Sequence, residues 1–253
     1  MPDDMRKHFK VDSGPMVLYH GTDRRLLPDD FKFNRSDEDN DFGKAMYFGL
    51  SVKMAYRWAK SRKAGIVNWY LFEPRLASES GKIAMKILDD PMVWINTILA
   101  IHDKRYSERA DIIAGDTMDA KTGDIMKRYD ALARSMLIPT SALDDDIKRR
   151  MVDELNPDHF DQQIAFRSRK ALSLVKFMGS VEVSEMDGEW IDDPDEIAAD
   201  VVELLSKRED LTQNEALSRF LRSDTFCKLI SDKRVSSVSP EQILEMYLSE
   251  AKT

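Results

Sequence analysis

The sequence predicts an α+β fold followed by a small helical module. Two observations indicate this class. Up to about residue 180, short apolar runs typical of strands alternate irregularly with segments of helical periodicity. From about residue 190 the signals are helical only. A chain of 253 residues with 42% hydrophobic side chains is long enough to bury a core.

Apolar runs and helical patterns define the elements of the first part. Runs rich in β-branched and aromatic residues predict strands at 16–19, 45–48, 67–72, 110–115, 163–166 and 174–177. Helical patterns fit 51–63, 91–103, about 141–155 and 168–173. Asp90-Pro91 supplies an N-cap and an N1 proline for the second helix.

The C-terminal part is predicted to be a separate helical module. Three helices follow the cap signals Asp193-Pro194, Thr212 with Glu215, and Ser239-Pro240. Residues 190–253 carry 14 acidic and 8 basic side chains, and the polar stretch 184–189 reads as a linker. We therefore expect two domains, at 14–180 and 190–253.

The composition indicates the cellular compartment and excludes some classes of binding partner. The chain contains one cysteine, Cys227, which fits a reducing compartment. The first residues lack the apolar segment of a secretory signal, and no stretch is long enough to span a bilayer. We expect a cytoplasmic protein without membrane association. A net charge of -8 argues against a broad phosphate-binding surface but leaves room for a local basic cleft.

Common catalytic motifs are missing from the sequence. It has no glycine-rich phosphate loop, no HExxH and no G-x-S-x-G. The histidines, at positions 8, 20, 102 and 159, have no metal-ligand spacing with the cysteine, so no metal site is expected. We interpret His102 as a core or edge residue of an apolar helix, and the basic run from Arg57 to Lys63 as a solvated helix face.

A different set of residues stands out. The first strand ends on His20-Gly21-Thr22, where a histidine at a turn can face a cleft. Gly43 and Gly49 bracket a strand that carries Tyr47, and a helix with Tyr56 follows. Gln163 opens a later predicted strand.

In this order, these motifs resemble the NAD-binding half of the diphtheria-toxin and poly(ADP-ribose) polymerase type of ADP-ribosyltransferase. The chain is still more similar to a bacterial family of unknown function that is placed among those enzymes. The resemblance spans about 16–178 and rests on five motifs in the same order: Leu18–Gly21, Asp41–Tyr47, Arg57–Ala59, Ala110–Asp119 and Gln163–Phe177.

The resemblance implies a split, mixed β-sheet with inserted helices around a cleft for NAD, used as a co-substrate without a metal. His20 matches the histidine that hydrogen-bonds the adenine-side ribose, and Gly21 the glycine whose backbone holds the nicotinamide amide. Thr22 belongs to the same NAD-binding strand end. Tyr47 matches the tyrosine that stacks on the nicotinamide ring, and Tyr56 a second stacking tyrosine of the polymerases.

The third catalytic position departs from the enzymes, because Gln163 stands where a glutamate is usual, as in the closer bacterial relatives. Glutamine can hydrogen-bond a ribose hydroxyl but carries no formal charge. The implied function is transfer of ADP-ribose to an unidentified protein or nucleic acid, as a toxin or conflict-system effector. The alternatives are a non-catalytic NAD-binding regulator and an NAD glycohydrolase.

The role of the tail also has two interpretations. Residues 190–253 faintly resemble a small helical protein encoded beside such transferases. An antitoxin-like partner, or regulation within the chain by this tail, would then act on the NAD cleft. The other interpretation is a helical bundle that only stabilises the main domain.

Overall fold

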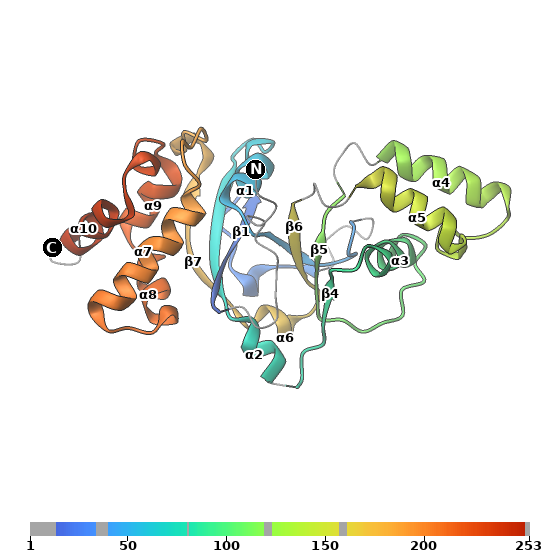
Figure 1. The fold of residues 1–253 in the computed structure, drawn as a ribbon, viewed down its shortest axis with the longest axis horizontal. Helices are drawn as coiled ribbons and strands as arrows, with labels where there is room; N and C mark the ends of the chain where they lie inside the picture. Colours follow the sequence, from blue (N-terminus) through green and yellow to red (C-terminus); the bar gives the residue numbers. More distant parts are fainter. Residues whose placement is uncertain (1–13, 34–39, 80, 119–122, 157–160, 251–253) are drawn as a thin grey trace. The chain divides into compact units, whose positions relative to one another are not determined.

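The computed structural model describes residues 14–33, 40–79, 81–118, 123–156 and 161–250, and Figure 1 labels their elements. These residues form two compact units. Unit 1 comprises the described residues within Lys32–Tyr47 and Ala77–Leu172. Unit 2 comprises those within Val11–Phe31, Phe48–Leu76 and Ser173–Thr253.

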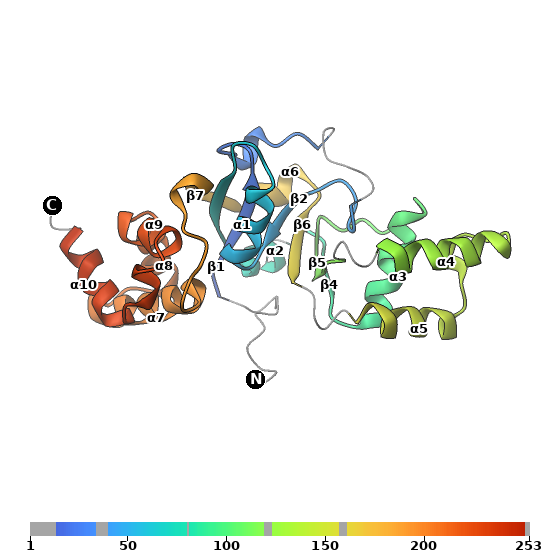
Figure 2. The ribbon, with the colours of Figure 1, turned by 90° about the horizontal axis from the view of Figure 1, so that it is seen from above.

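Unit 1 contains three paired strands. Strand β4 (Met85–Leu88) runs parallel to β5 (Ile112–Asp116), and β5 runs antiparallel to β6 (Gln162–Phe166). Four helices belong to the same unit: α3 (Pro91–His102), α4 (Gly123–Ser135), α5 (Asp145–Leu155) and α6 (Arg169–Leu172). Figure 2 shows α3, α4 and α5 gathered together. Their buried side chains form one cluster with Phe42, Ile113 and Ala165.

Unit 2 contains an antiparallel arrangement of strands. Its strands are β1 (Met16–Thr22), β3 (Ile66–Phe72) and β7 (Val175–Glu182), and strand β2 (Met46–Gly49) ends in this unit. Hydrogen-bonded strands follow one another in the order β2-β1-β3-β7. Helix α1 (Val52–Lys60) contacts β1, and α2 (Pro74–Glu79) follows β3. Because the described strands pair in both directions and occur with helices, the predicted α+β class is confirmed.

The tail of unit 2 has one helix more than expected. The described helices are α7 (Pro194–Glu209), α8 (Gln213–Phe220), α9 (Asp224–Ser231) and α10 (Pro240–Glu250), where three were predicted. Helix α9 is capped by Ser223, whose side chain accepts a hydrogen bond from the Phe226 amide. The caps expected at Asp193 and Thr212 are confirmed, the second as a complete capping box. None of the described helices has both the length and the apolar character needed to cross a bilayer.

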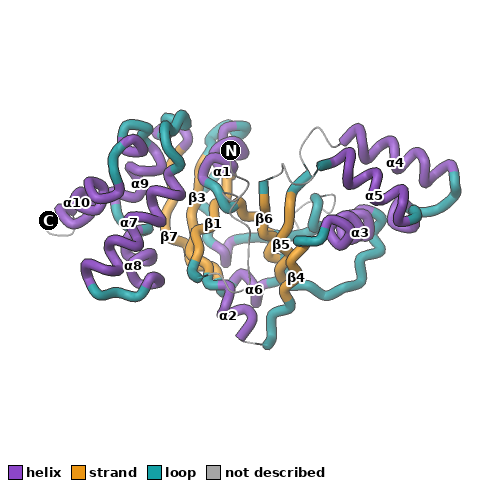
Figure 3. The backbone as a smooth tube through the Cα atoms, in the orientation of Figure 1, coloured by secondary structure: helices purple, strands orange, loops and turns teal. Residues whose placement is uncertain are grey.

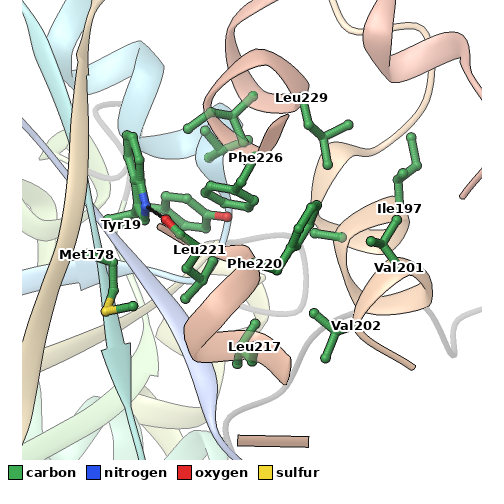
Figure 4. Packing of buried hydrophobic residues seen from close by; sticks show 14 of the residues in the cluster. Tyr19, Met178, Ile197, Val201, Val202, Leu217, Phe220, Leu221, Phe226 and Leu229 are labelled. Atoms are coloured by element: carbon green, nitrogen blue, oxygen red, sulfur yellow. Dashed lines mark hydrogen bonds between the residues drawn. The ribbon is translucent and has the colours of Figure 1, made fainter. Parts of the chain in front are cut away.

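The tail helices share one hydrophobic core with the strands of unit 2. Figure 4 shows Phe220 and Phe226 between residues of α7 and the strand residues Tyr19 and Met178. The indole nitrogen of Trp69 on β3 donates a 2.8 Å hydrogen bond to the carbonyl oxygen of Leu221. Figure 3 shows the four tail helices beside β7. The sequence boundary at 180–190 remains a prediction about independent folding, since the compact units divide the chain elsewhere.

Two elements of unit 1 were not predicted from the sequence. Strand β4 has only Leu88 fully buried, so it lacks the apolar run that marks the other strands. Helix α4 buries three side chains, Met126, Tyr129 and Ala133, and is otherwise polar. The expected helix at 91–103 is confirmed as α3, and its N-cap carboxylate on Asp90 accepts hydrogen bonds from the amides of Met92 and Val93.

Candidate functional site

The His20-Gly21-Thr22 segment is the last part of strand β1 in unit 2. All three residues are half-buried and remain paired with β3, His20 opposite Asn68 and Thr22 opposite Ile66. The His20 ring meets the edge of Phe48, with ring centroids 6.1 Å apart. The segment is therefore ordered strand backbone that ends at a partly exposed surface.

Asn68 fixes the turn that follows this strand. Its side chain is fully buried. The amide nitrogen donates to the carbonyl oxygens of His20 (3.4 Å) and Arg24 (3.1 Å), and the amide oxygen accepts from the Leu26 N–H (3.1 Å). The Tyr70 hydroxyl donates to the Leu26 carbonyl at 2.6 Å. Sequence reasoning placed Asn68 in a strand but missed this positioning role, for which a buried polar residue in an apolar run was the available signal.

Gly21 is required by the packing of α1. A Cβ atom on this residue would lie 2.1 Å from the carbonyl oxygen of Ala55 and 2.8 Å from the amide nitrogen of Ala59. Both are backbone atoms of a helix, so they cannot move aside cheaply. The predicted role in holding a nicotinamide amide stays a prediction, and the structure supplies a second reason for glycine here.

Tyr56 packs against the segment that leads into the tail. A Cβ on Gly188, which has φ +72°, would lie 2.3 Å from the Tyr56 ring. Trp190 meets the same ring edge-on at 5.5 Å, and the Lys60 ammonium lies 5.6 Å from its centroid. Helix α1 covers the face of β1 that carries Gly21. Because successive residues of a strand point to opposite faces, His20 points to the other face. The structure thus does not bring Tyr56 next to His20.

Tyr47 is held by the turn that precedes it in unit 1. Its hydroxyl donates a 2.6 Å hydrogen bond to the Gly43 carbonyl and accepts a 3.0 Å bond from the Phe42 amide. The Phe42 and Tyr47 rings are nearly parallel, at 15° with centroids 6.3 Å apart. Gly43 has φ +71°, a conformation that glycine adopts without strain. The half-buried Tyr47 ring is consequently fixed at both its body and its hydroxyl.

Gln163 lies on β6, in the same unit as Tyr47. It is half-buried and pairs with Gly115 of β5. By strand alternation it shares a face with Ala165, which belongs to the cluster against which Tyr47 packs. The Gln163 side chain makes no hydrogen bond with the part of the chain that the structure describes. Its amide is a half-buried group that a ligand hydroxyl can satisfy.

Asp41 is a charged group that sequence reasoning did not single out. Its carboxylate accepts a 2.9 Å hydrogen bond from the Met118 amide. Burial raises the pKa of this carboxyl from 3.8 to about 6, although the Met118 N–H lowers it again in part. Asp41 directly precedes the turn that holds Tyr47, so a group that titrates near neutrality adjoins this turn.

The predicted site residues thus fall into two groups. His20, Gly21, Thr22 and Tyr56 belong to unit 2, and Tyr47 and Gln163 to unit 1.

The other histidine that the structure describes lies on helix α3. His102 is the exposed last residue of α3, and its Nε2 lies 3.2 Å from a carboxylate oxygen of Asp130. His8, His159 and Asp119 lie outside the described residues. Within the described ranges, no three histidine, cysteine or acidic side chains are placed to hold a metal ion.

Comparison with protein families gives one match. The family model described as "Protein of unknown function (DUF3990)" matches residues 16–177. The chain belongs to this DUF3990 family. Comparisons with curated proteins and with solved structures found no match. Any activity assigned to this DUF3990 protein is therefore argued from its own residues and from the resemblance of its motifs.

Proposed function

We propose that this DUF3990 protein binds NAD and transfers its ADP-ribose group to a macromolecular acceptor. The observation that carries the proposal is the clamped Tyr47. A hydroxyl bonded to Gly43 and Phe42 immobilises the ring, and the ring stays half-buried. A fixed aromatic surface is what stacking on a nicotinamide ring requires, because offset-stacked rings gain energy only in a defined geometry.

The end of strand β1 supports the same proposal. Asn68 fixes the backbone around His20 through three hydrogen bonds, and Gly21 lets helix α1 pack closely against the opposite face of the strand. Preorganised backbone and imidazole groups can hydrogen-bond a ribose and an amide without losing further conformational entropy. The rigidity of this strand end is thus suited to holding a small polar ligand.

The proposed reaction cleaves the bond between the nicotinamide nitrogen and C1′ of its ribose. The electron pair of that bond leaves with nicotinamide, a nucleophile of the acceptor forms the new bond to C1′, and the acceptor loses a proton. Positive charge develops on the ribose in the transition state, so a dipole aimed at it accelerates the step. We assign this role to the Gln163 carbonyl, while Tyr47 orients the leaving ring and His20 holds the other ribose.

Gln163 also keeps an alternative open. An amide lacks the negative charge of a carboxylate, so it stabilises the developing cation less. A protein that holds NAD without turnover is the second candidate. Plain hydrolysis of NAD, with water as the nucleophile, is the third and needs no macromolecular acceptor.

Binding is tested by calorimetry with NAD. His20→Ala should weaken binding by about 1–3 kcal/mol, the cost of leaving a polar partner unsatisfied. Tyr47→Ala should also weaken binding because it removes the stacking surface. His102→Ala is the matched control, since His102 is an exposed histidine paired with Asp130. Unchanged NAD affinity in both site variants, with intact folds, rules the proposed site out.

Chemistry is tested by single-turnover release of nicotinamide. Gln163→Ala should slow release about 100-fold, the effect of losing one preorganised polar group, with little change in NAD affinity. Gln162→Ala is the control, because alternation places Gln162 on the opposite face of β6. Equal rates for wild type and Gln163→Ala remove Gln163 from the mechanism. Tight NAD binding without release favours the regulator, and release of free ADP-ribose without labelled macromolecule favours the glycohydrolase.

A further inference from the structure

Unit 1 contains a strongly basic surface in a protein that is acidic as a whole. Three segments, 82–86, 104–111 and 167–170, hold eight lysines and arginines against two carboxylates. The whole chain has 38 basic and 46 acidic residues. A surplus of six positive charges in 17 residues is therefore a local feature that the net charge of -8 conceals.

Direct contacts join the three segments. The Lys170 ammonium lies 2.7 Å from the Asp111 carboxylate and donates a 2.6 Å hydrogen bond to the carbonyl oxygen of Lys82. The backbone of Asp111 bonds both neighbours, because its amide donates to Ala84 and its carbonyl oxygen accepts from Arg167. The segments meet where β4 and β5 begin and β6 ends. We call these three segments the basic edge.

Arg167 lies at the centre of the basic edge without an anionic partner. Its guanidinium stacks on the Tyr106 ring, 5.1 Å from the centroid, and its Nε is buried without a hydrogen-bond partner. Among the described residues, Arg167 forms no ion pair. A partly buried guanidinium is costly unless an anion meets it, so this side chain is arranged for an anion that comes from outside the chain.

The two carboxylates of the basic edge are already engaged. Glu108 pairs with Lys86 and accepts a 3.3 Å hydrogen bond from the Tyr106 hydroxyl. The Asp111 carboxylate pairs with Lys170 and accepts a 2.9 Å bond from the Ala84 amide. Neither pairs with Arg167, and Arg105 and Arg109 are exposed beside Tyr106. The three segments therefore carry more basic than acidic side chains even though both of their carboxylates are paired within the basic edge.

We propose that the basic edge binds the phosphate backbone of a single-stranded nucleic acid, which is the acceptor of the proposed transfer. A surplus of six positive charges on three segments exceeds what the two phosphates of a dinucleotide can engage, so an extended polyphosphate fits better. A guanidinium that stacks on an aromatic ring, with exposed arginines beside that ring, suits phosphates between stacked bases. The identity of the acceptor rests on the proposed function, whereas binding to the basic edge does not.

The test is fluorescence anisotropy with a labelled single-stranded RNA of mixed sequence, in the absence of NAD. Arg105→Glu with Arg109→Glu should weaken binding at least about tenfold, because two phosphate contacts become repulsive. Arg167→Ala should also weaken it. In Arg105→Ala with Arg109→Ala, the slope of log affinity against log salt should fall by about 1.4, or about 0.7 per lost contact.

The matched control is Arg62→Glu with Lys63→Glu, an equal charge change at exposed residues of unit 2, and it should bind RNA like wild type. Equal loss in both double variants, or no RNA binding by wild type, overturns the proposal. Displacement of RNA by polyglutamate of equal charge points instead to an acidic protein partner and also overturns it. Because no NAD is present, failed transfer leaves the binding result standing. If RNA binds at the basic edge but receives no label from NAD, then the RNA is not the acceptor, whereas its binding to the basic edge still holds.

Discussion

Replacing Asp41 with asparagine should stabilise the protein at neutral pH and have little effect in acid. Asp41 is half-buried beside the Tyr47 turn, and this burial raises the pKa of its carboxyl from 3.8 to about 6. A native state that holds its proton more tightly than the unfolded chain loses stability as pH rises. Asparagine removes that titration but keeps an oxygen that can accept the 2.9 Å bond from Met118.

The magnitude follows from the shift of about two pKa units. Such a shift is worth about 3 kcal/mol between the fully protonated and fully ionised limits. The stabilising contribution of protonated Asp41 is complete below pH 3.8 and is lost as the pH passes about 6. Between about pH 4.5 and 7.5, the free energy of unfolding of the wild type should therefore fall by about 2 kcal/mol because Asp41 loses its proton. Asp41→Asn should not show this fall.

The assay is urea unfolding of both proteins across this pH range, which gives the free energy of unfolding at each pH. Asp89→Asn is the matched control, since it removes the same charge at an exposed position of unit 1 and should track the wild type within about 0.5 kcal/mol. A difference between wild type and Asp41→Asn that is constant with pH refutes the reasoning. So does a wild type that gains stability relative to the variant as pH rises.

Three further predictions concern the packing of unit 2 and of its tail. Gly21→Ala should destabilise the protein by more than about 3 kcal/mol, because its Cβ would lie 2.1 Å from a carbonyl oxygen. Gly123→Ala should be nearly neutral, because a Cβ there would meet no atom within 4 Å. Thermal melts compare the stabilities of the two variants. Asn68→Ala should cost about 2–3 kcal/mol by leaving the buried Leu26 amide unbonded, and unfolding unchanged from wild type would contradict that bond. A chain ending at residue 189 should lose cooperative unfolding because it exposes the shared core, and a sharp melt of the shortened chain would instead support an independent tail.

The sequence predicted elements well where the signal was local. A carboxylate before a proline placed the starts of α3 and α7, and the Thr212 capping box placed α8. The sequence analysis missed helix α9, although Ser223 supplies an N-cap for it. The apolar residues of α9 follow those of α8 so closely that the two helices were not told apart. Strand β4 was missed because a half-buried strand of four residues leaves little periodicity to detect.

The site depended more on contacts between distant residues, which a single sequence does not reveal. The roles of His20, Tyr47 and Gln163 came from the resemblance. The reasons for their local order came from elsewhere: Asn68, 48 residues after His20, fixes one backbone, and the Gly43 carbonyl holds the Tyr47 hydroxyl. Tyr56 illustrates the converse, since its contacts with Gly188 and Trp190 arise from a tail that sequence reasoning treated as separate.

The placement of the indole side chains gives each unit its own optical reporter. Of the four tryptophans, Trp94 alone falls in unit 1, where it is buried and donates to the Asp116 carbonyl. Trp69 is buried in unit 2, while Trp58 there is 54% exposed. Two variants, one keeping only Trp94 and the other only Trp69, with the remaining tryptophans replaced by phenylalanine, each follow the melting of one unit. Ligand-induced quenching then reports which unit a nucleotide or a nucleic acid has reached.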